Sequence, residues 1–334
     1  MIHPSKEGNL IPKGPDQFVG GSQGMSLLNA LYYAFKPFLP QSVRYTVRRL
    51  RANYKLQNLK DWPIMPSAGA PPSGWQGWPD NKRFAVVLTH DVEGPLGVER
   101  CRQLAELETR HGFRSSFNLI PEGSYIVTPE FRDELTRGGF EIGVHDLKHD
   151  GSLYRSRKIF EESAQRINTY LADWNAVGFR SGFMFHNLEW IEALNIAYDA
   201  STFDTDPFEP QPEGVGTIFP FRVGGPDKSY IELPYTLPQD STLFLILREQ
   251  TIDIWKRKTD WLAERGGMVL LNVHPDYLAF GGRKPGASEF DAALYEEFLC
   301  YLKQRYRGEY WNPLAREVAA FVGALPASTS EREI

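Results

Sequence analysis

The sequence predicts an α/β fold built around a parallel sheet, either a (β/α) barrel or a doubly wound sheet. From residue 83 onward, short apolar runs alternate with amphipathic stretches of helical length. Polar clusters follow several of the apolar runs, and the carboxyl ends of strands are where barrels place their chemistry. The 334 residues suffice for one domain of about 250 residues and an accessory segment.

Each expected element follows from this alternation. Buried-strand patterns occur at 84–88, 113–120, 140–144, 176–180, 196–203, 230–235 and 268–273. Helical patterns occur at 98–110, 129–137, 156–174, 251–265 and 288–306. Helices placed between strands in this way are the crossover connections that parallel strands require.

The start of the chain differs in composition from the rest. Residues 1–24 are rich in Gly, Pro and polar side chains, which predicts a flexible leader. Residues 25–81 are expected to form a helical arm that ends in a Pro/Gly/Trp-rich linker over 61–81. The main domain is then predicted to span 82–325, with 326–334 as a tail.

The arm is predicted to contain two helices. Apolar residues at helical spacing mark the first, which Pro37 and Pro40 should end: Leu27, Leu28, Leu31, Tyr32, Phe35 and Phe38. The second carries the basic residues Arg44, Arg48, Arg49, Arg51 and Lys55. Such a helix can lie on a membrane, so residues 25–55 are a candidate for peripheral membrane contact. The favoured interpretation is an arm that packs on the main domain with its arginines in solvent.

Composition and charge argue against several classes of protein. A formal net charge of -5 gives no argument for nucleic-acid binding. No apolar run is long enough to predict a transmembrane helix, and no signal-peptide pattern begins the sequence, so a cytoplasmic enzyme is expected. Cys101 and Cys300 lie far apart without metal-binding spacing, which predicts two buried thiols and no disulfide.

Two histidines four residues apart provide the strongest chemical signal. His145 and His149 follow a predicted buried strand in His-Asp-Leu-Lys-His, and both imidazoles can face one way on a helical turn and share a divalent metal. Two surface or helix-capping histidines are the alternative, because a metal site also needs a third ligand.

The end of the first predicted strand offers that third ligand. Asp91 and Glu93 lie two residues apart between Thr89 and Pro95, so on an extended chain both side chains point to the same face. Two carboxylates beside one cation can divide the work, one binding the metal and the other accepting a proton from water. An acidic loop start or helix cap before Pro95 is the alternative.

Three more polar residues are placed near the ends of predicted strands. His274 leaves a buried strand, where it can titrate near neutral pH as a general acid, with a satisfied loop histidine as the alternative. Arg180 can serve the site or form a surface ion pair. Asp199, with Asp204 and Asp206 nearby, can instead belong to a turn rich in Asx caps.

Taken in order, five motifs across residues 84–277 resemble those of the polysaccharide deacetylase family, also called carbohydrate esterase family four. The run that starts at Thr89 resembles the family's Thr-Phe-Asp-Asp-Gly-Pro motif, and the one at His145 its His-(Ser/Thr)-x-x-His motif. Arg180 stands where the family has an arginine that braces the base, and Asp199 resembles the acidic partner of that arginine. His274, followed by proline, resembles the motif that carries the catalytic acid.

This resemblance implies a distorted parallel (β/α) barrel with an N-terminal helical arm, and metal-dependent removal of an N-acetyl group from an amino sugar. The implied metal ligands are Glu93, His145 and His149, and the implied catalytic groups are Asp91 as base, His274 as acid, and Arg180 and Asp199 as partners of the base. The longer Glu93 side chain leaves the reverse assignment open, with Asp91 as the ligand. Zinc suits such a ligand set, and other divalent first-row metals remain open.

The sequence departs from the family pattern at several positions. Val92 separates the two acids, Asp146 replaces a serine or threonine, and the proline expected two residues after Arg180 is absent. These departures indicate a divergent branch. The alternatives are hydrolysis of another amide or ester on the same scaffold, or a non-catalytic carbohydrate-binding protein.

An acetylated carbohydrate is the expected partner, carried on a nucleotide or a lipid inside the cell. Five aromatic residues are candidates for stacking on sugar rings, although at least half are expected in the core: Tyr235, Trp255, Trp261, Tyr277 and Phe280. Asp240 is expected to contact substrate or to occupy a turn.

Overall fold

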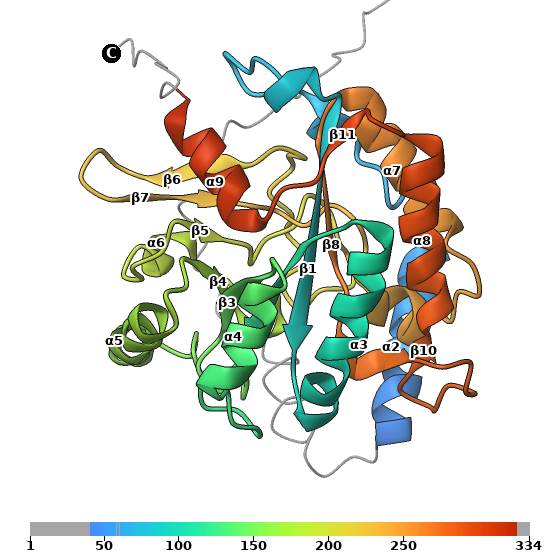
Figure 1. Ribbon diagram of the computed structural model, residues 1–334, viewed down its shortest axis with the longest axis horizontal. Coiled ribbons are helices and arrows are strands. Elements are labelled where there is room, and N and C mark those ends of the chain that lie inside the picture. Colours follow the sequence, from blue (N-terminus) through green and yellow to red (C-terminus); the bar gives the residue numbers. More distant parts are fainter. Residues whose placement is uncertain (1–40, 58, 60, 326–334) are drawn as a thin grey trace, which may run out of the picture.

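In the computed structural model, which describes residues 41–57, 59 and 61–325, nine strands form one curled, mostly parallel sheet (Figure 1). The order is β11-β1-β2-β3-β4-β5-β7-β6. Strands β11 and β2 pair one after the other along the same edge of β1, and β8 pairs with its opposite edge. The β6–β7 pair is antiparallel and the other pairs in this sheet are parallel. The strands are β1 (Phe84–Val92), β2 (Ser115–Leu119), β3 (Glu141–His145), β4 (Gly178–Arg180), β5 (Tyr198–Asp199), β6 (Phe221–Gly224), β7 (Ser229–Glu232), β8 (Met268–Asn272) and β11 (Tyr310–Trp311).

The chain that follows β7 lies against β8 and closes the barrel. The backbone N–H groups of Thr236 and Leu237 both donate to the carbonyl of Leu270, over 3.1 and 3.2 Å. The Thr236 hydroxyl accepts a hydrogen bond from the Leu270 N–H at 3.0 Å. A side chain thus replaces part of the strand ladder, which is why the barrel is distorted at this seam.

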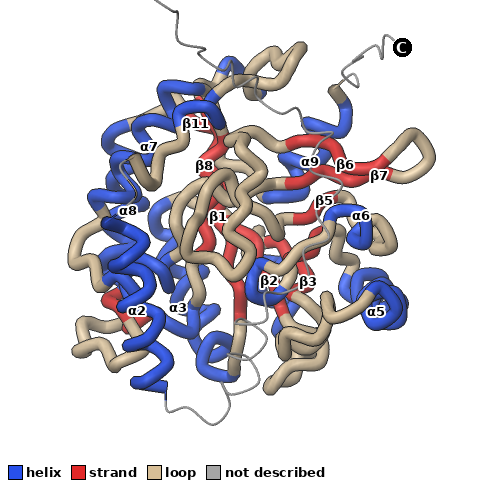
Figure 2. The backbone as a smooth tube through the Cα atoms, turned by 180° about the vertical axis from the view of Figure 1, so that it is seen from behind, coloured by secondary structure: helices blue, strands red, loops and turns tan. Residues whose placement is uncertain are grey.

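Helices surround the barrel on its outer side (Figures 1 and 2). They are α2 (Gln41–Gln57), α3 (Pro95–His111), α4 (Pro129–Arg137), α5 (Arg157–Trp174), α6 (Leu188–Ile191), α7 (Asp253–Arg265), α8 (Ala292–Arg305) and α9 (Ala315–Ala324). The shorter helical elements are η3 (Pro66–Gly69), η4 (Pro79–Asn81), η5 (Gly182–Met184), the π-helix η6 (Ser241–Leu247) and η7 (Pro275–Tyr277). A separate two-stranded sheet consists of β9 (Leu278–Ala279) and β10 (Phe290–Asp291). Hydroxyl caps begin two of the helices, from Thr128 to α4 and from Ser156 to α5.

Strand β1 forms the centre of the core. All nine of its residues are buried, as expected for a parallel strand covered on both faces. Val86 and Leu88 pack in the cluster beneath the helices, whereas Ala85 and Val87 pack inside the barrel. Because side chains alternate along a strand, Asp91 then points into the barrel.

The structure confirms the predicted barrel and corrects parts of the element list. The strand predicted at 196–203 is reduced to the two residues of β5, and helix α8 begins at Ala292. The β6–β7 hairpin has one strand that was not predicted, and neither η6 nor α9 was predicted. Cys101 is buried as expected, whereas Cys300 is only half-buried, and both thiols are free.

The second helix expected in the arm is present as α2. The first expected helix, the leader at 1–24 and the tail at 326–334 lie outside the described residues. The arginines of α2 do not all face solvent: Arg49 is part-buried, and its guanidinium donates to the Leu245 carbonyl over 3.0 and 3.2 Å. Within the described ranges, no helix combines the length and apolar character needed to cross a bilayer.

Candidate metal centre and catalytic residues

Three potential metal ligands meet at the carboxyl ends of β1 and β3. Glu93, His145 and His149 each place one ligand atom within 4.8 Å of the others. His149 Nε2 lies 3.3 Å from Glu93 Oε1. The described part of the chain contains no second group of three or more such residues. The spacing suits a single cation held by two imidazoles and one carboxylate.

The environment of His145 fits a metal ligand. Its Nδ1 lies 3.1 Å from the carbonyl of Arg180, which places the proton on Nδ1 and the lone pair on Nε2. That Nε2 atom is buried and has no hydrogen-bond partner among the described residues. Burial lowers the pKa of His145, which keeps the ring neutral as ligation requires.

A glycine leaves room for His149. The ring of His149 stacks on Phe183, with centroids 4.4 Å apart. A Cβ atom at Gly182 would lie 2.8 Å from Cδ2 of His149 and 2.5 Å from Oδ2 of Asp146. Both Asp146 and His149 have positive φ, at 57° and 55°, so the segment between them is tightly constrained. The aspartate in the histidine motif and the glycine that replaces the family's proline therefore depend on each other sterically.

Asp91 lies beside these ligands and is held by three polar side chains. Its Oδ1 accepts from the Asn118 amide at 2.8 Å and lies 3.5 Å from Arg180 Nη1. Its Oδ2 accepts from the Asn272 amide at 2.8 Å and lies 4.0 Å from Nε2 of His145. Burial opposes ionisation, but the positive charges of Arg180 and His274 and the hydrogen bond from Asn118 outweigh it and hold the pKa of Asp91 well below its usual value. The carboxylate is therefore ionised at neutral pH.

His274 lies across the site and pairs with Asp240. Its Nδ1 is 2.7 Å from Oδ1 of Asp240, and its backbone N–H donates to Oδ2 over 2.7 Å. Nε2 of His274 points toward Glu93 Oε1, 3.9 Å away. Burial alone would lower the pKa of His274, but the Asp240 carboxylate and the nearby Glu93 raise it to about 10. The ring is thus protonated at neutral pH, rather than titrating near neutrality as the sequence suggested.

Glu93 is oriented from η7. The Tyr277 hydroxyl donates to its Oε2 over 2.5 Å, and the Glu93 N–H donates to Oδ2 of Asp276 over 2.9 Å. Asp276 also accepts from the N–H of Gly97 at the start of α3. The carboxylate group of Glu93 is therefore held by a segment that lies far away in the sequence.

The chain resembles known proteins in structure but not detectably in sequence. No protein-family model and no curated protein matches the chain. Solved structures that match include a protein described as a polysaccharide deacetylase from Mycobacterium smegmatis, with a TM-score of 0.57, 19% identity, and coverage of 81% of this chain and 100% of that one. Puue allantoinase matches with a TM-score of 0.56, 16% identity, and coverage of 80% and 100%.

The chain has the polysaccharide deacetylase fold. The barrel expected from the five motifs is therefore confirmed, and the deacetylase fold places the ends of β1, β3 and β8 around one site. Allantoinase shares the fold, so the fold by itself does not select the substrate.

One contact expected in a polysaccharide deacetylase is not made here. Arg180 donates to Ala200 O at 2.8 Å and to the Thr89 hydroxyl at 3.0 Å, and it forms no ion pair with Asp199. Asp199 accepts instead from the Ser201 hydroxyl at 2.6 Å, and the register of β5 against β7 places it beside Glu232. Burial raises the pKa of both carboxyls. The expected partnership of Arg180 and Asp199 is therefore wrong.

Other expectations are also corrected. Asp240, for which a substrate contact or a turn was expected, is fully buried and pairs with His274. Tyr235, Trp255 and Trp261 are buried and cannot offer a ring face, whereas Tyr277 and Phe280 remain half-buried.

Three residues that hold the site were not predicted from the sequence as site residues. They are Asn118, Asn272 and Tyr277, of which Tyr277 was considered only for stacking. Asn118 and Asn272 lie near the ends of predicted strands, and this position could have indicated that they face the site.

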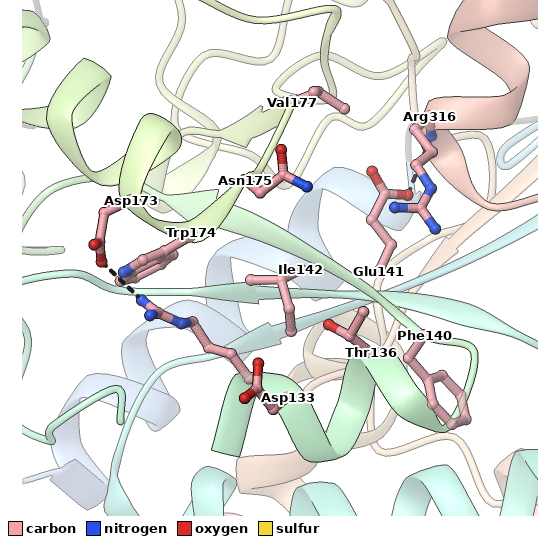
Figure 3. Close-up of a pocket in the computed structure, with 11 residues that line it drawn as sticks. Asp133, Thr136, Phe140, Glu141, Ile142, Asp173, Trp174, Asn175, Val177 and Arg316 are labelled. Carbon is pink, nitrogen blue, oxygen red and sulfur yellow. Dashed lines mark hydrogen bonds and ion pairs between the residues drawn. The ribbon is translucent and has the colours of Figure 1, made fainter. Parts of the chain in front are cut away.

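A cavity of about 250 Å³ lies elsewhere, at the amino end of β3 (Figure 3). Arg132 and Asp173 form an ion pair at 3.1 Å on one side of it, and Glu141 accepts from the Arg316 N–H on the other. None of the predicted catalytic or metal-binding residues lines it. In barrels, this end of the strands serves stability rather than chemistry.

Replacing Gly182 with alanine should disturb metal binding without unfolding the chain. The new methyl group would displace His149, and such changes around a ligand typically weaken metal affinity about 10–100-fold. Competition with a chromophoric chelator measures this. Gly225→Ala is the matched control because no heavy atom would lie within 4 Å of its Cβ. Unchanged affinity in Gly182→Ala would show that this contact does not position His149.

Proposed function

We propose that the chain is a metal-dependent hydrolase that removes an N-acetyl group from an amino sugar and releases acetate. The observation that carries the proposal is the cluster of Glu93, His145 and His149 between an ionised Asp91 and a protonated His274. A base and an acid held in opposite protonation states on two sides of one site are what amide hydrolysis needs.

The three clustered residues would hold a divalent metal, for which zinc fits the ligand set best. A bound cation of this kind supplies Lewis acidity, polarising a carbonyl and making water more acidic. The partnerless Nε2 of His145 and the neutral state of its ring support this assignment. Glu93 rather than Asp91 is the proposed carboxylate ligand, because Asp91 already accepts two amide hydrogen bonds and faces Arg180.

Asp91 would accept the proton of the attacking water. Asn118 and Asn272 hold its two oxygens, which fixes the direction in which the carboxylate can accept. The charge of Arg180 favours the ionised form of Asp91, and the guanidinium is itself held by the Ala200 carbonyl and the Thr89 hydroxyl. His274 would then donate its proton to the departing amine as the carbon–nitrogen bond breaks, with Asp240 holding the ring.

A second candidate is hydrolysis of another amide on the same scaffold. It is favoured by the near-equal similarity to Puue allantoinase, whose TM-score differs by only 0.01 from that of the deacetylase. The same base, acid and metal ligands would serve either reaction, so the assay decides between the two.

Asp91→Asn tests the proposal directly. The metal-loaded wild type should release acetate from N-acetylglucosamine oligosaccharides, and the variant should lose about 10²–10⁴-fold of that rate because it has no base. Metal content should stay unchanged, because Asp91 is not a proposed ligand. Loss of metal in the variant would reverse the roles of Asp91 and Glu93. A wild type that releases no acetate but hydrolyses another amide would favour the second candidate.

Asp240→Asn should change the pH dependence of the reaction. The Asp240 carboxylate raises the pKa of His274 to about 10. Without that charge, the acid would lose its proton at lower pH, and the alkaline limb of the kcat profile should move down by about 1–3 pH units. An unshifted alkaline limb would mean that His274 is not the acid.

A further inference from the structure

The exposed large apolar side chains of the described residues gather at one end of the barrel. Six such side chains occur: Val47, Leu50, Tyr54, Leu96, Ile126 and Val177. The first three belong to α2. Leu96 lies in the first turn of α3, directly after β1, and Ile126 lies in the loop that follows β2. Only Val177 precedes its strand, so it lies at the opposite end.

The end that carries five of these six side chains is the end that carries the candidate site. In Figure 1, α2 and the first turns of α3 lie toward the end to which the arrow of β1 points. Asp91 and Glu93 are placed at that same end of β1. Apolar side chains that adjoin one another on a surface mark an interaction site, and three of the five lie together on α2.

Helix α2 presents its apolar residues on the side that faces away from the barrel. Ala52 is buried and Arg49 donates to Leu245 of η6, which defines the inner side. Leu50 and Tyr54 are 66% and 71% exposed on the opposite side. Val47 and Arg51 share that outer side at helical spacing.

All charged residues of α2 are basic. Its seventeen residues include five basic and no acidic ones, although the whole chain has a net charge of -5. Arg48 and Arg51 are exposed beside the apolar side chains. Arginines flanking an exposed apolar stripe are the pattern of a helix that lies in the interface of an anionic bilayer.

Contacts connect α2 to the catalytic carboxylate. The Lys55 ammonium donates to the Pro207 carbonyl, which lies two residues before Glu209 in the chain. Glu209 accepts from the Gln239 amide at 2.7 Å, and the Gln239 oxygen accepts from Asn272 at 3.1 Å. Asn272 is the residue that holds Asp91. The segment against which α2 packs is therefore linked by hydrogen bonds to the residue that holds Asp91.

We propose that α2, Leu96 and Ile126 dock the chain on an anionic lipid bilayer with the candidate site facing the membrane, and that the acetylated sugar is carried on a lipid. The statement about the sugar rests on the proposed function, whereas the docking does not. A flat bilayer can contact separate projections around one site at the same time. A protein partner would instead require one continuous complementary surface.

Flotation of the full 334-residue chain with vesicles tests the docking without any assay of activity. The wild type should bind vesicles of phosphatidylcholine mixed with phosphatidylglycerol, bind vesicles of phosphatidylcholine alone more weakly, and dissociate as salt is raised. Arg51→Gln should lower the affinity for the mixed vesicles about fivefold. The double variant Leu50→Glu/Ile126→Glu should lose most of the binding.

Val177→Glu is the control for each single replacement, because it places one glutamate on an exposed apolar position at the other end of the barrel. It should bind the mixed vesicles like the wild type. The proposal is overturned if the wild type does not float with the mixed vesicles, or if the double variant floats as well as Val177→Glu does. A change in the solution mass of Leu50→Glu without lipid would also overturn it, in favour of contact with a second copy of the chain.

The sugar carrier is tested separately from the docking. Acetate release from a lipid-linked N-acetyl sugar in mixed vesicles should fall in the double variant, while release from a soluble oligosaccharide should stay unchanged. A chain that binds vesicles but releases no acetate from either substrate would contradict the proposed function and leave the docking supported. Equal release by both proteins from the lipid-linked sugar would contradict the inferred substrate.

Discussion

The nine buried residues of β1 pair with β2 and β11 along one edge and with β8 along the other, and the position of the candidate site depends on this pairing. Because the strand is fixed on both edges, its alternation is also fixed. His90 then points to the helices, where it bonds to Glu108 at 2.8 Å, and Asp91 points into the barrel. A shift by one residue would exchange the two and remove the carboxylate from the site.

The ionised state of Asp91 depends on polar side chains that the neighbouring strands place around it. Asn118 comes from β2, Arg180 from β4 and Asn272 from β8, so three separate strands hold one carboxylate. His274 is held in its positively charged form, because the Asp240 carboxylate stabilises the protonated ring. The candidate site thereby keeps one carboxylate ionised and one imidazole protonated on two sides of the potential ligands, although several charged groups are buried.

Residues that are close in sequence could be predicted, because local spacing decides their geometry. Asp91 and Glu93 share a strand end, and His145 and His149 share the turn after β3, so the pattern was sufficient to place them together. Asp240 could not be assigned to His274, because 34 residues and the π-helix η6 separate them. No local pattern predicts which turn will reach across the barrel.

The error about Asp199 has a topological cause. The register of β5 against β7 places Asp199 beside Glu232, and the chain reaches β7 only through the hairpin with β6. The partnership with Arg180 was implied by the resemblance to the family, and no local pattern showed that the predicted strands at 196–203 and 230–235 would pair. Helix α9 was missed although Ala315, Val318, Ala319 and Val322 have helical spacing, because the short turn before it gave no strong start signal.

Metal analysis tests the central claim, that Glu93, His145 and His149 form one cation site, most directly. Wild-type chain reconstituted with zinc and freed of excess metal should retain about one equivalent, as expected for a site of this composition. The double variant His145→Ala/His149→Ala should retain none, while His111→Ala, which alters a histidine paired with Glu296 away from the site, should retain the full amount. Equal zinc content in all three proteins, or none in the wild type, would contradict the account.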